Sequence, residues 1–179
     1  MSKKYELTNE TKPLEGGTVL HRIRALRDIP RFGVKAGELG GFVEGENNLS
    51  QDGDAWVSDN AKVSGNAEVS DNACVSDNAC VYGNAYVAGN AKVSGNAKVE
   101  NGHDYFVAKN TWSSLRWFTY TRSNKKWAVG CFQGSGEELV AKAYKDSKLS
   151  GKCYEAIVHA VETIEAAKAE AKGKSNGSK

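Results

Sequence analysis

The sequence is poor in the residues on which metal and redox sites depend. It has four cysteines and three histidines among 179 residues. The cysteines, at positions 74, 80, 131 and 153, form no CxxC pair and show no repeated spacing with histidine. We therefore predict no metal site and no cofactor. Cys74 and Cys80 are six residues apart, and we expect a reduced, cytosolic chain without a disulfide between them.

Long apolar stretches and a strong charge of one sign are also missing. No run approaches the roughly 20 apolar residues of a membrane-spanning helix. The polar start, MSKKYELTNE, does not have the pattern of a signal peptide. The formal net charge of +2 by itself implies neither nucleic acid nor a membrane as partner. We expect no membrane contact and no binding to duplex nucleic acid.

A familiar catalytic pattern is absent as well. The sequence has no Ser-His-Asp arrangement, no H-x-x-E-H motif and no evident pair of spaced carboxylates. This favours a protein that binds over one that catalyses.

What the sequence does contain is one six-residue phrase, repeated eight times without a gap from Asp52 to Val99. In order the phrases are DGDAWV, SDNAKV, SGNAEV, SDNACV, SDNACV, YGNAYV, AGNAKV and SGNAKV. A helix with an apolar residue at every sixth position has no apolar face, and the Gly, Asn and Asp breaks also exclude one. The pattern predicts very short strands, with Val and Ala inward. Asn with Asp or Gly takes each corner, where left-handed backbone angles are needed.

This phrase resembles the hexapeptide repeat of left-handed parallel β-helices. The resemblance implies a triangular prism with three phrases, or eighteen residues, per coil, and fewer than three coils over residues 52–99. Residues eighteen apart would then stack at roughly 4.8 Å. The implied inner columns are Val57, Val75 and Val93; Val63, Val81 and Val99; and Val69 with Val87. Asn60, Asn78 and Asn96 would form a ladder of stacked amides at one corner.

Residues 1–45 are predicted to be an N-terminal cap that covers the first coil. The segment from Val19 to Leu26 alternates apolar and basic residues as a half-buried strand does, and Asp28, Pro30 and Gly33 interrupt it. Val43 and Leu49 approach the register of the repeat, so inward positions can begin before residue 52. An end unit of this kind would cover unpaired strand edges.

The opening half of the chain resembles hexapeptide-repeat proteins encoded by bacteriophages and prophages. The residues that carry this resemblance are LHRIRALRDI and VKAGELGGFVEGENNLSQDGDAWVSDNAKVSGNA. Residues 103–154 resemble a small domain that also recurs in phage proteins. The resemblance implies an architecture, a phage setting and the host cytosol as the place of action.

The composition changes after Val99. Tyr105–Ala108, Trp117–Thr121 and Lys126–Phe132 are predicted strands, with a hairpin turn over 123–126. Ser135 and Glu138 form a capping box for a helix over 137–145, and Ser150 is the expected cap of a second helix. The predicted parts are therefore a cap at 1–45, a left-handed β-helix at 46–102, a β-β-β-α-α domain at 103–166 and a disordered tail at 167–179. The fold class is mainly β with a C-terminal α+β domain.

Basic and aromatic residues are interleaved in this C-terminal region. Residues 46–102 hold three lysines against eight acids, whereas residues 103–150 hold eight basic residues against four acids. Such a mixture can bind a nucleotide or single-stranded nucleic acid through stacking and charge. The alternative, which the pattern favours, is a hairpin with buried aromatic and solvated basic residues. The predicted ligand-binding residues are Trp112, Arg116, Trp117, Tyr120, Arg122, Lys125 and Trp127.

Large apolar side chains at outward positions of the repeat suggest a contact between subunits. The candidates are Trp56, Tyr82 and Tyr86, and scattered surface aromatic residues are the alternative. The resemblance to hexapeptide-repeat proteins implies a homotrimer packed along the faces of the prism.

Three functions remain open at this point. The first is a non-catalytic phage protein that engages a host protein or sequesters a small nucleotide signal, and so antagonises host antiviral defence. The second is a structural module that trimerises and displays the C-terminal domain. The third follows from the many acyltransferases among hexapeptide-repeat proteins, which implies acyl-CoA chemistry with His103 as the base.

Overall fold

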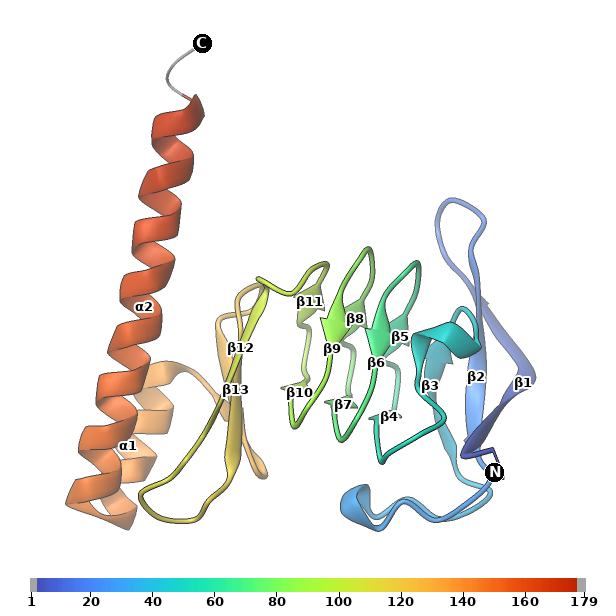
Figure 1. Ribbon diagram of the computed structural model, residues 1–179, viewed down its shortest axis with the longest axis horizontal. Helices are drawn as coiled ribbons and strands as arrows, with labels where there is room; N and C mark the ends of the chain where they lie inside the picture. The colour runs from blue at the N-terminus through green and yellow to red at the C-terminus, as the bar shows by residue number, and fades with distance from the viewer. Residues whose placement is uncertain (1–2, 177–179) are drawn as a thin grey trace.

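The computed structural model describes the backbone of residues 3–176 and the side chains of residues 3–171. Three parts follow one another along the long axis of the molecule (Figure 1). An N-terminal antiparallel sheet is followed by a stack of short parallel strands, and an α+β unit completes the chain. Residues 177–179 of the tail that we predicted to be disordered lie outside the described residues.

The repeat region is a β-solenoid of about three turns. Its strands are two residues long: β4 Trp56–Val57, β5 Lys62–Val63, β6 Glu68–Val69, β7 Cys74–Val75, β8 Cys80–Val81, β9 Tyr86–Val87, β10 Lys92–Val93 and β11 Lys98–Val99. Each pairs in parallel with the strand eighteen residues away, as Lys62 with Cys80. The strands fall on three faces, namely β5-β8-β11, β4-β7-β10 and β6-β9.

The predicted inner columns are confirmed. Val57 pairs with Val75, and Val63 with Val81, and every valine of the eight phrases is buried. The inward positions begin early, as expected, because Val43 and Leu49 are buried and in register with the coils. Val43 pairs with Val63, twenty residues on, so the first turn is two residues longer than the others.

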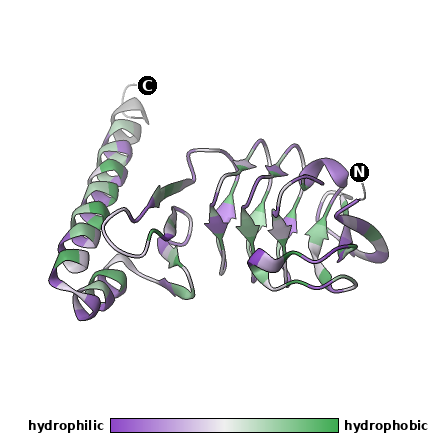
Figure 2. Ribbon diagram, turned by 60° about the horizontal axis from the view of Figure 1, so that its bottom comes forward, coloured by the Kyte–Doolittle hydropathy of each residue, from purple (hydrophilic) through white to green (hydrophobic). Residues whose placement is uncertain are grey.

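The corners of the coils hold residues with left-handed backbone angles, as the pattern predicts. Asp59, Asp71 and Asp77 have φ of 57°, 58° and 61°, and glycine takes this position in the other phrases. The aspartates also join neighbouring coils, since Asp77 Oδ2 accepts the Gly95 N–H at 2.7 Å. The corners are visibly hydrophilic (Figure 2).

The stacked amides lie at a different corner from the one we predicted. Asn66 Nδ2 donates to Asn84 Oδ1 at 3.2 Å, whereas no hydrogen bond joins the described side chains of Asn60, Asn78 and Asn96 to one another. At the corner of Asn60 and Asn78 the connection is made by a carboxylate, because Asp59 Oδ2 accepts the Asp77 N–H at 3.2 Å.

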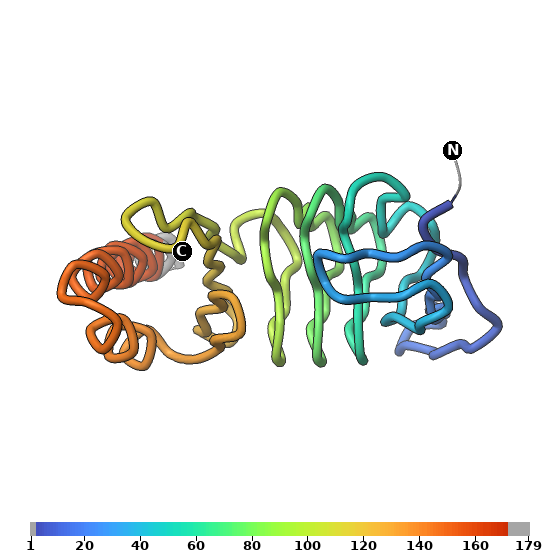
Figure 3. The backbone as a smooth tube through the Cα atoms, turned by 90° about the horizontal axis from the view of Figure 1, so that it is seen from below, coloured from blue at the N-terminus to red at the C-terminus, as the bar shows by residue number. Residues whose placement is uncertain are grey.

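The N-terminal strands extend one face of the solenoid. Strands β1 (Tyr5–Pro13), β2 (Val19–Ala25) and β3 (Leu39–Val43) give the order β1-β2-β3-β5-β8-β11. Short 3-10 turns lie at Pro30–Phe32 and Glu46–Asn48. The connection between β2 and β3 runs beneath the coils (Figures 1 and 3).

The predicted position of Trp56 was wrong. We predicted it as an outward residue at a subunit contact, but it is only 2% exposed and belongs to the core of the solenoid. The N-terminal sheet covers it, and a methyl group added at Gly40 would come within 2.7 Å of the Trp56 ring. The first coil therefore buries its large outward side chain within the same chain.

The C-terminal unit has four strands and two helices. The strands are β12 (Tyr105–Lys109), β13 (Trp117–Thr121), β14 (Lys126–Val129) and β15 (Phe132–Gly134), paired antiparallel in that order. The single strand predicted over 126–132 is two strands, because a turn at Gly130, with φ of 58°, reverses the chain. The hairpin between β13 and β14 is confirmed.

Helices α1 (Gly136–Asp146) and α2 (Lys148–Asn176) pack on this sheet. The Ser135–Glu138 capping box of α1 is confirmed. Ser150 lies inside α2 rather than at its start, where Ser147 Oγ accepts the Ser150 N–H at 3.0 Å. The chain remains helical through Asn176, beyond the predicted end at residue 166, since its Ala, Glu and Lys residues have high helix propensity.

The last coil and the C-terminal sheet are joined by hydrogen bonds. In each earlier coil a backbone N–H donates to a carbonyl of the following coil, as Cys74 does to Ala91. The last coil has no successor, so the N–H groups of Lys92 and Lys98 donate to the hydroxyls of Thr119 and Ser123, at 2.9 and 2.6 Å. These bonds fix the position of β13 against the solenoid. None of the described helices is long and apolar enough to span a membrane.

Candidate anion-binding groove

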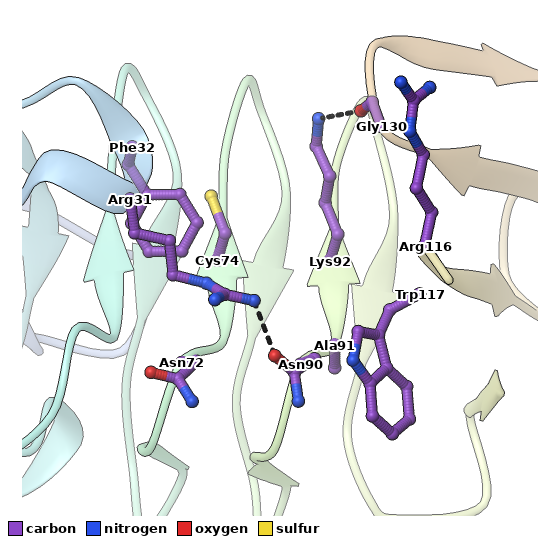
Figure 4. Close-up of a pocket in the computed structure, with 10 residues that line it drawn as sticks. All are labelled: Arg31, Phe32, Asn72, Cys74, Asn90, Ala91, Lys92, Arg116, Trp117 and Gly130. Carbon is purple, nitrogen blue, oxygen red and sulfur yellow. Dashed lines mark hydrogen bonds between the residues drawn. The ribbon is translucent and has the colours of Figure 1, made fainter. Parts of the chain in front are cut away.

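A groove of about 550 Å³ lies where all three parts of the molecule meet. Its floor is the β4-β7-β10 face, one wall is the β2–β3 connection, and the other wall is the C-terminal sheet (Figure 4). We call it the basic groove. It is lined by Arg31, Phe32, Asn72, Cys74, Asn90, Ala91, Lys92, Arg116, Trp117 and Gly130.

The first wall is a tight turn that presents Arg31 and Phe32. Ile29 and Val34 are buried and bridge to each other, which anchors both ends of the turn. Gly33 closes it with φ of 71°, an angle that favours glycine. Arg31 Nη2 donates to Asn90 Oδ1 at 2.5 Å, and the guanidinium lies 5.8 Å from the centre of the Phe32 ring.

The second wall begins with a loop that ends at Arg116. The buried Asn110 organises this loop, since its Oδ1 accepts the Ser113 N–H at 2.9 Å and its backbone N–H donates to the Arg116 carbonyl at 2.8 Å. The Arg116 guanidinium lies against Gly130. Trp117 is 38% exposed, and the Lys109 ammonium lies 5.8 Å from the centre of its ring.

The floor contributes a third cation and a thiol. Lys92 Nζ donates to the Gly130 carbonyl at 3.1 Å, which brings it to the Arg116 end of the groove. Burial raises the pKa of the Cys74 thiol to about 11, although the nearby Lys92 opposes this. The thiol is therefore protonated at neutral pH and is a poor nucleophile.

The charge of the groove is of one sign. Arg31, Lys92 and Arg116 line it, and no carboxylate is among the lining residues. Among the side chains that the structure describes, none of these three cations forms an ion pair. Their hydrogen-bond partners here are the neutral oxygens of Asn90 and Gly130. An anion in the groove would meet three cations without having to displace a carboxylate.

Two of the seven predicted ligand-binding residues line this groove, Arg116 and Trp117. Tyr120 and Trp127 are buried in the core of the C-terminal unit. Trp112 is half-buried and packs edge-on against Tyr154, with ring centres 5.1 Å apart. The sequence pattern did not distinguish core aromatic residues from exposed ones, because both alternate with basic residues.

The other two predicted residues, Arg122 and Lys125, do not line the groove. Arg122 pairs with Glu165 at 2.7 Å, and Lys125 is exposed with φ of 52°. His103 is exposed in a turn that lines a separate cavity of about 220 Å³ with Arg122 and Glu165. Tyr82 is half-buried, and Tyr86 is 53% exposed on the third face of the solenoid.

Sequence reasoning missed Arg31, Phe32 and Lys92. Lys92 could have been found, because the eighteen-residue period places it in one outward column with Trp56 and Cys74. Nothing in the local sequence around Arg31 and Phe32 indicates that their turn reaches the second and third coils.

The described residues contain no group of three or more His, Cys, Asp or Glu side chains able to hold a metal ion. Comparison of the chain with models of protein families and with curated proteins finds no match.

Proposed function

We propose that the protein binds a small anionic ligand of the nucleotide class in the basic groove and does not transform it. The observation that carries this proposal is the presence of three cations and an exposed indole around a floor without carboxylates. Guanidinium groups bind phosphate through paired hydrogen bonds, and an aromatic face accepts a base by stacking.

Binding without turnover is supported by the groups that line the groove. The Cys74 thiol is held protonated by burial, and the amides of Asn72 and Asn90 neither accept nor release protons near neutral pH. The histidine that an acyltransferase would need, His103, is not among the lining residues.

The biological role that we propose is sequestration of a nucleotide signal, by which a phage protein antagonises host defence in the host cytosol. Its support is the resemblance of LHRIRALRDI and the segment from Val34 to Ala67 to phage-encoded repeat proteins. The same resemblance supports a left-handed coil and a capping role for the N-terminal sheet. A chain that sequesters needs a rigid site and no catalytic group, and a groove over a stacked β-coil suits that need.

The proposal is tested by calorimetric titration with a panel of nucleotides. We expect the double variant Arg31→Ala/Arg116→Ala to lose about a hundredfold or more in affinity, since each charge-assisted hydrogen bond contributes about 1.5–3 kcal/mol. The matched control is Lys125→Ala/Lys126→Ala, which removes the same charge from exposed positions outside the groove.

Affinity for the wild type should also fall as salt is raised, because charges are screened over about 8–10 Å at physiological ionic strength. Failure of every nucleotide to bind would refute the proposal. Equal losses in the two double variants would move the site away from the groove to the general charge of the C-terminal unit.

A further inference from the structure

A second cavity, of about 500 Å³, lies within the C-terminal unit. It is formed between the loop that joins β12 to β13 and the turn that joins α1 to α2, which lie at the same end of the unit (Figure 1). Both segments contribute hydroxyl groups to its lining, and we call it the hydroxyl pocket. These groups belong to Ser113, Ser114, Ser147, Ser150 and Tyr154.

Three of the hydroxyl groups are close neighbours. Asn110 Nδ2 donates to the Ser114 hydroxyl at 3.4 Å and to the Tyr154 hydroxyl at 3.2 Å, so one amide holds both. Ser150 precedes Tyr154 by four residues on α2, and residues at this spacing lie on the same side of a helix. The Ser150 hydroxyl therefore lies beside that of Tyr154 in the pocket.

Two of these groups are buried donors without an acceptor. Ser150 is 5% exposed and Tyr154 is 6% exposed. The Tyr154 oxygen accepts from Asn110, but neither hydroxyl donates a hydrogen bond to any oxygen of the described residues. A buried hydroxyl that donates to nothing costs free energy unless water or a ligand supplies the acceptor. The pocket thus calls for an occupant that accepts hydrogen bonds.

The charges around the pocket favour an anionic acceptor. Arg116 and Lys142 line it, and among the side chains that the structure describes neither takes part in an ion pair. Asp146 is the one carboxylate among the lining residues, and it follows Lys142 by four residues on α1. Two cations against one carboxylate attract an oxyanion, which accepts stronger hydrogen bonds than a neutral oxygen does.

The rest of the lining is largely apolar. Val129, Phe132, Leu139 and Ala143 contribute to it, and the Lys142 ammonium lies 5.8 Å from the centre of the Phe132 ring. Small-molecule sites commonly combine such an apolar surface with a few polar groups that fix the orientation of the ligand. An inorganic ion would leave this apolar surface without a partner.

We propose that the hydroxyl pocket binds a small organic anion. Its carboxylate or phosphate group accepts from the hydroxyls of Ser150 and Tyr154, and its apolar body packs toward Phe132. This site is distinct from the basic groove, although Arg116 lines both cavities. Water is the alternative occupant, since it also accepts hydrogen bonds but carries no charge.

The first test compares benzoate with benzamide, which has nearly the same shape and no charge, by calorimetry. Phenyl phosphate tests the other head group, and acetate and inorganic phosphate test each head group without an apolar body. We expect one aromatic anion to bind per chain, at least ten times more tightly than benzamide and than the anion that lacks the ring. Benzamide that bound as tightly as both aromatic anions, or acetate that bound as tightly as benzoate, would overturn the proposal. Failure of all five probes to bind would leave the pocket to water.

A second test locates the bound anion with variants outside the basic groove. Ser150→Ala/Tyr154→Phe removes both buried donors with little change of shape and should weaken binding of the aromatic anion at least tenfold. Tyr144→Phe removes a tyrosine hydroxyl from α1 outside the pocket and should leave the affinity unchanged. Unchanged thermal melting verifies that each variant is folded.

The exposed charges give a test that does not disturb buried groups. Lys142→Gln should weaken binding of the aromatic anion, whereas Asp146→Asn should strengthen it, because one removes an attraction and the other a repulsion. Neither residue lines the basic groove, so nucleotide affinity there should stay the same in both variants. Anion affinity that was unchanged in Lys142→Gln and in Ser150→Ala/Tyr154→Phe would place the anion outside the pocket and overturn the proposal, without bearing on the proposed function.

Discussion

Lys4 illustrates at the residue scale how the open start of a parallel coil acquires hydrogen-bond partners. Carbonyl groups of the first coil have no preceding coil to supply N–H donors. The Lys4 side chain is fully buried, and its Nζ donates to the carbonyls of Ala55 and Asp52 at 2.8 and 3.3 Å. Tyr5 supplies a second donor, from its hydroxyl to the Leu49 carbonyl at 2.7 Å. A polar residue is thus more useful there than an apolar one.

The burial of Lys4 predicts a dependence of stability on pH. Loss of hydration, reinforced by the nearby Arg27, lowers the pKa of Lys4 to about 8 from its ordinary value of 10.5. Between these two values the unfolded chain binds more protons than the folded chain at this site, so its contribution to stability rises with pH. The free energy of unfolding of the wild type, relative to Lys4→Met, should rise on the order of 2 kcal/mol from pH 7.5 to 10.

Urea unfolding of both proteins at the two pH values measures this difference. The raised pKa values of Cys74 and Tyr5 act in the opposite direction, because the unfolded chain loses these protons first. They are common to both proteins and cancel in the comparison. A difference between the proteins that stays constant with pH would show that Lys4 is not held in a dehydrated site.

At the scale of the elements, the junction of the last coil with β13 is the reverse of the first coil, because it lacks hydrogen-bond acceptors rather than donors. Here the coil presents unpaired N–H groups, and the C-terminal sheet supplies acceptors, including Thr119 for Lys92. Thr119 is 1% exposed. Thr119→Val keeps the shape of the side chain and leaves the partly buried N–H of Lys92 without its acceptor. We expect a loss of about 1–3 kcal/mol in the free energy of unfolding.

Chemical denaturation of Thr119→Val, with the exposed Thr111→Val as control, tests this contribution. The control should change stability by less than about 0.5 kcal/mol, as exposed substitutions usually do. Equal stabilities of the two variants would mean that the hydroxyl of Thr119 is dispensable. In that case the two parts would be held together by their other contacts alone.

Some elements can be predicted from nearby residues alone, and others depend on parts of the chain that are distant in sequence. The short strands of the solenoid are predictable because the phrase repeats its inward valine and its left-handed corner eight times. The split of 126–132 into two strands depends on one glycine angle at Gly130, and the burial of Trp56 depends on a sheet that is distant in sequence. The groove is harder still to predict, because Arg31 and Arg116 line one groove only after all three parts have assembled.

At the scale of the whole molecule, one face of the solenoid is already used within the chain. The β4-β7-β10 face carries the buried Trp56, the connection at Arg31 and the basic groove. A neighbouring subunit would therefore have to pack on the other two faces, where Tyr82 and the 53% exposed Tyr86 lie. This arrangement would leave the groove open in an oligomer.

We propose on this basis a homotrimer that contacts through Tyr82 and Tyr86, in agreement with the resemblance to hexapeptide-repeat proteins. A lysine in place of Tyr86 would have to be buried in the contact without a partner, which costs several kcal/mol. Light scattering at micromolar concentration should then give a trimer for the wild type and a monomer for Tyr86→Lys, with nucleotide affinity unchanged. The control Tyr144→Lys alters an exposed tyrosine on α1 and should remain trimeric. A wild-type protein that is monomeric under these conditions would refute the trimer and leave the groove to act within one chain.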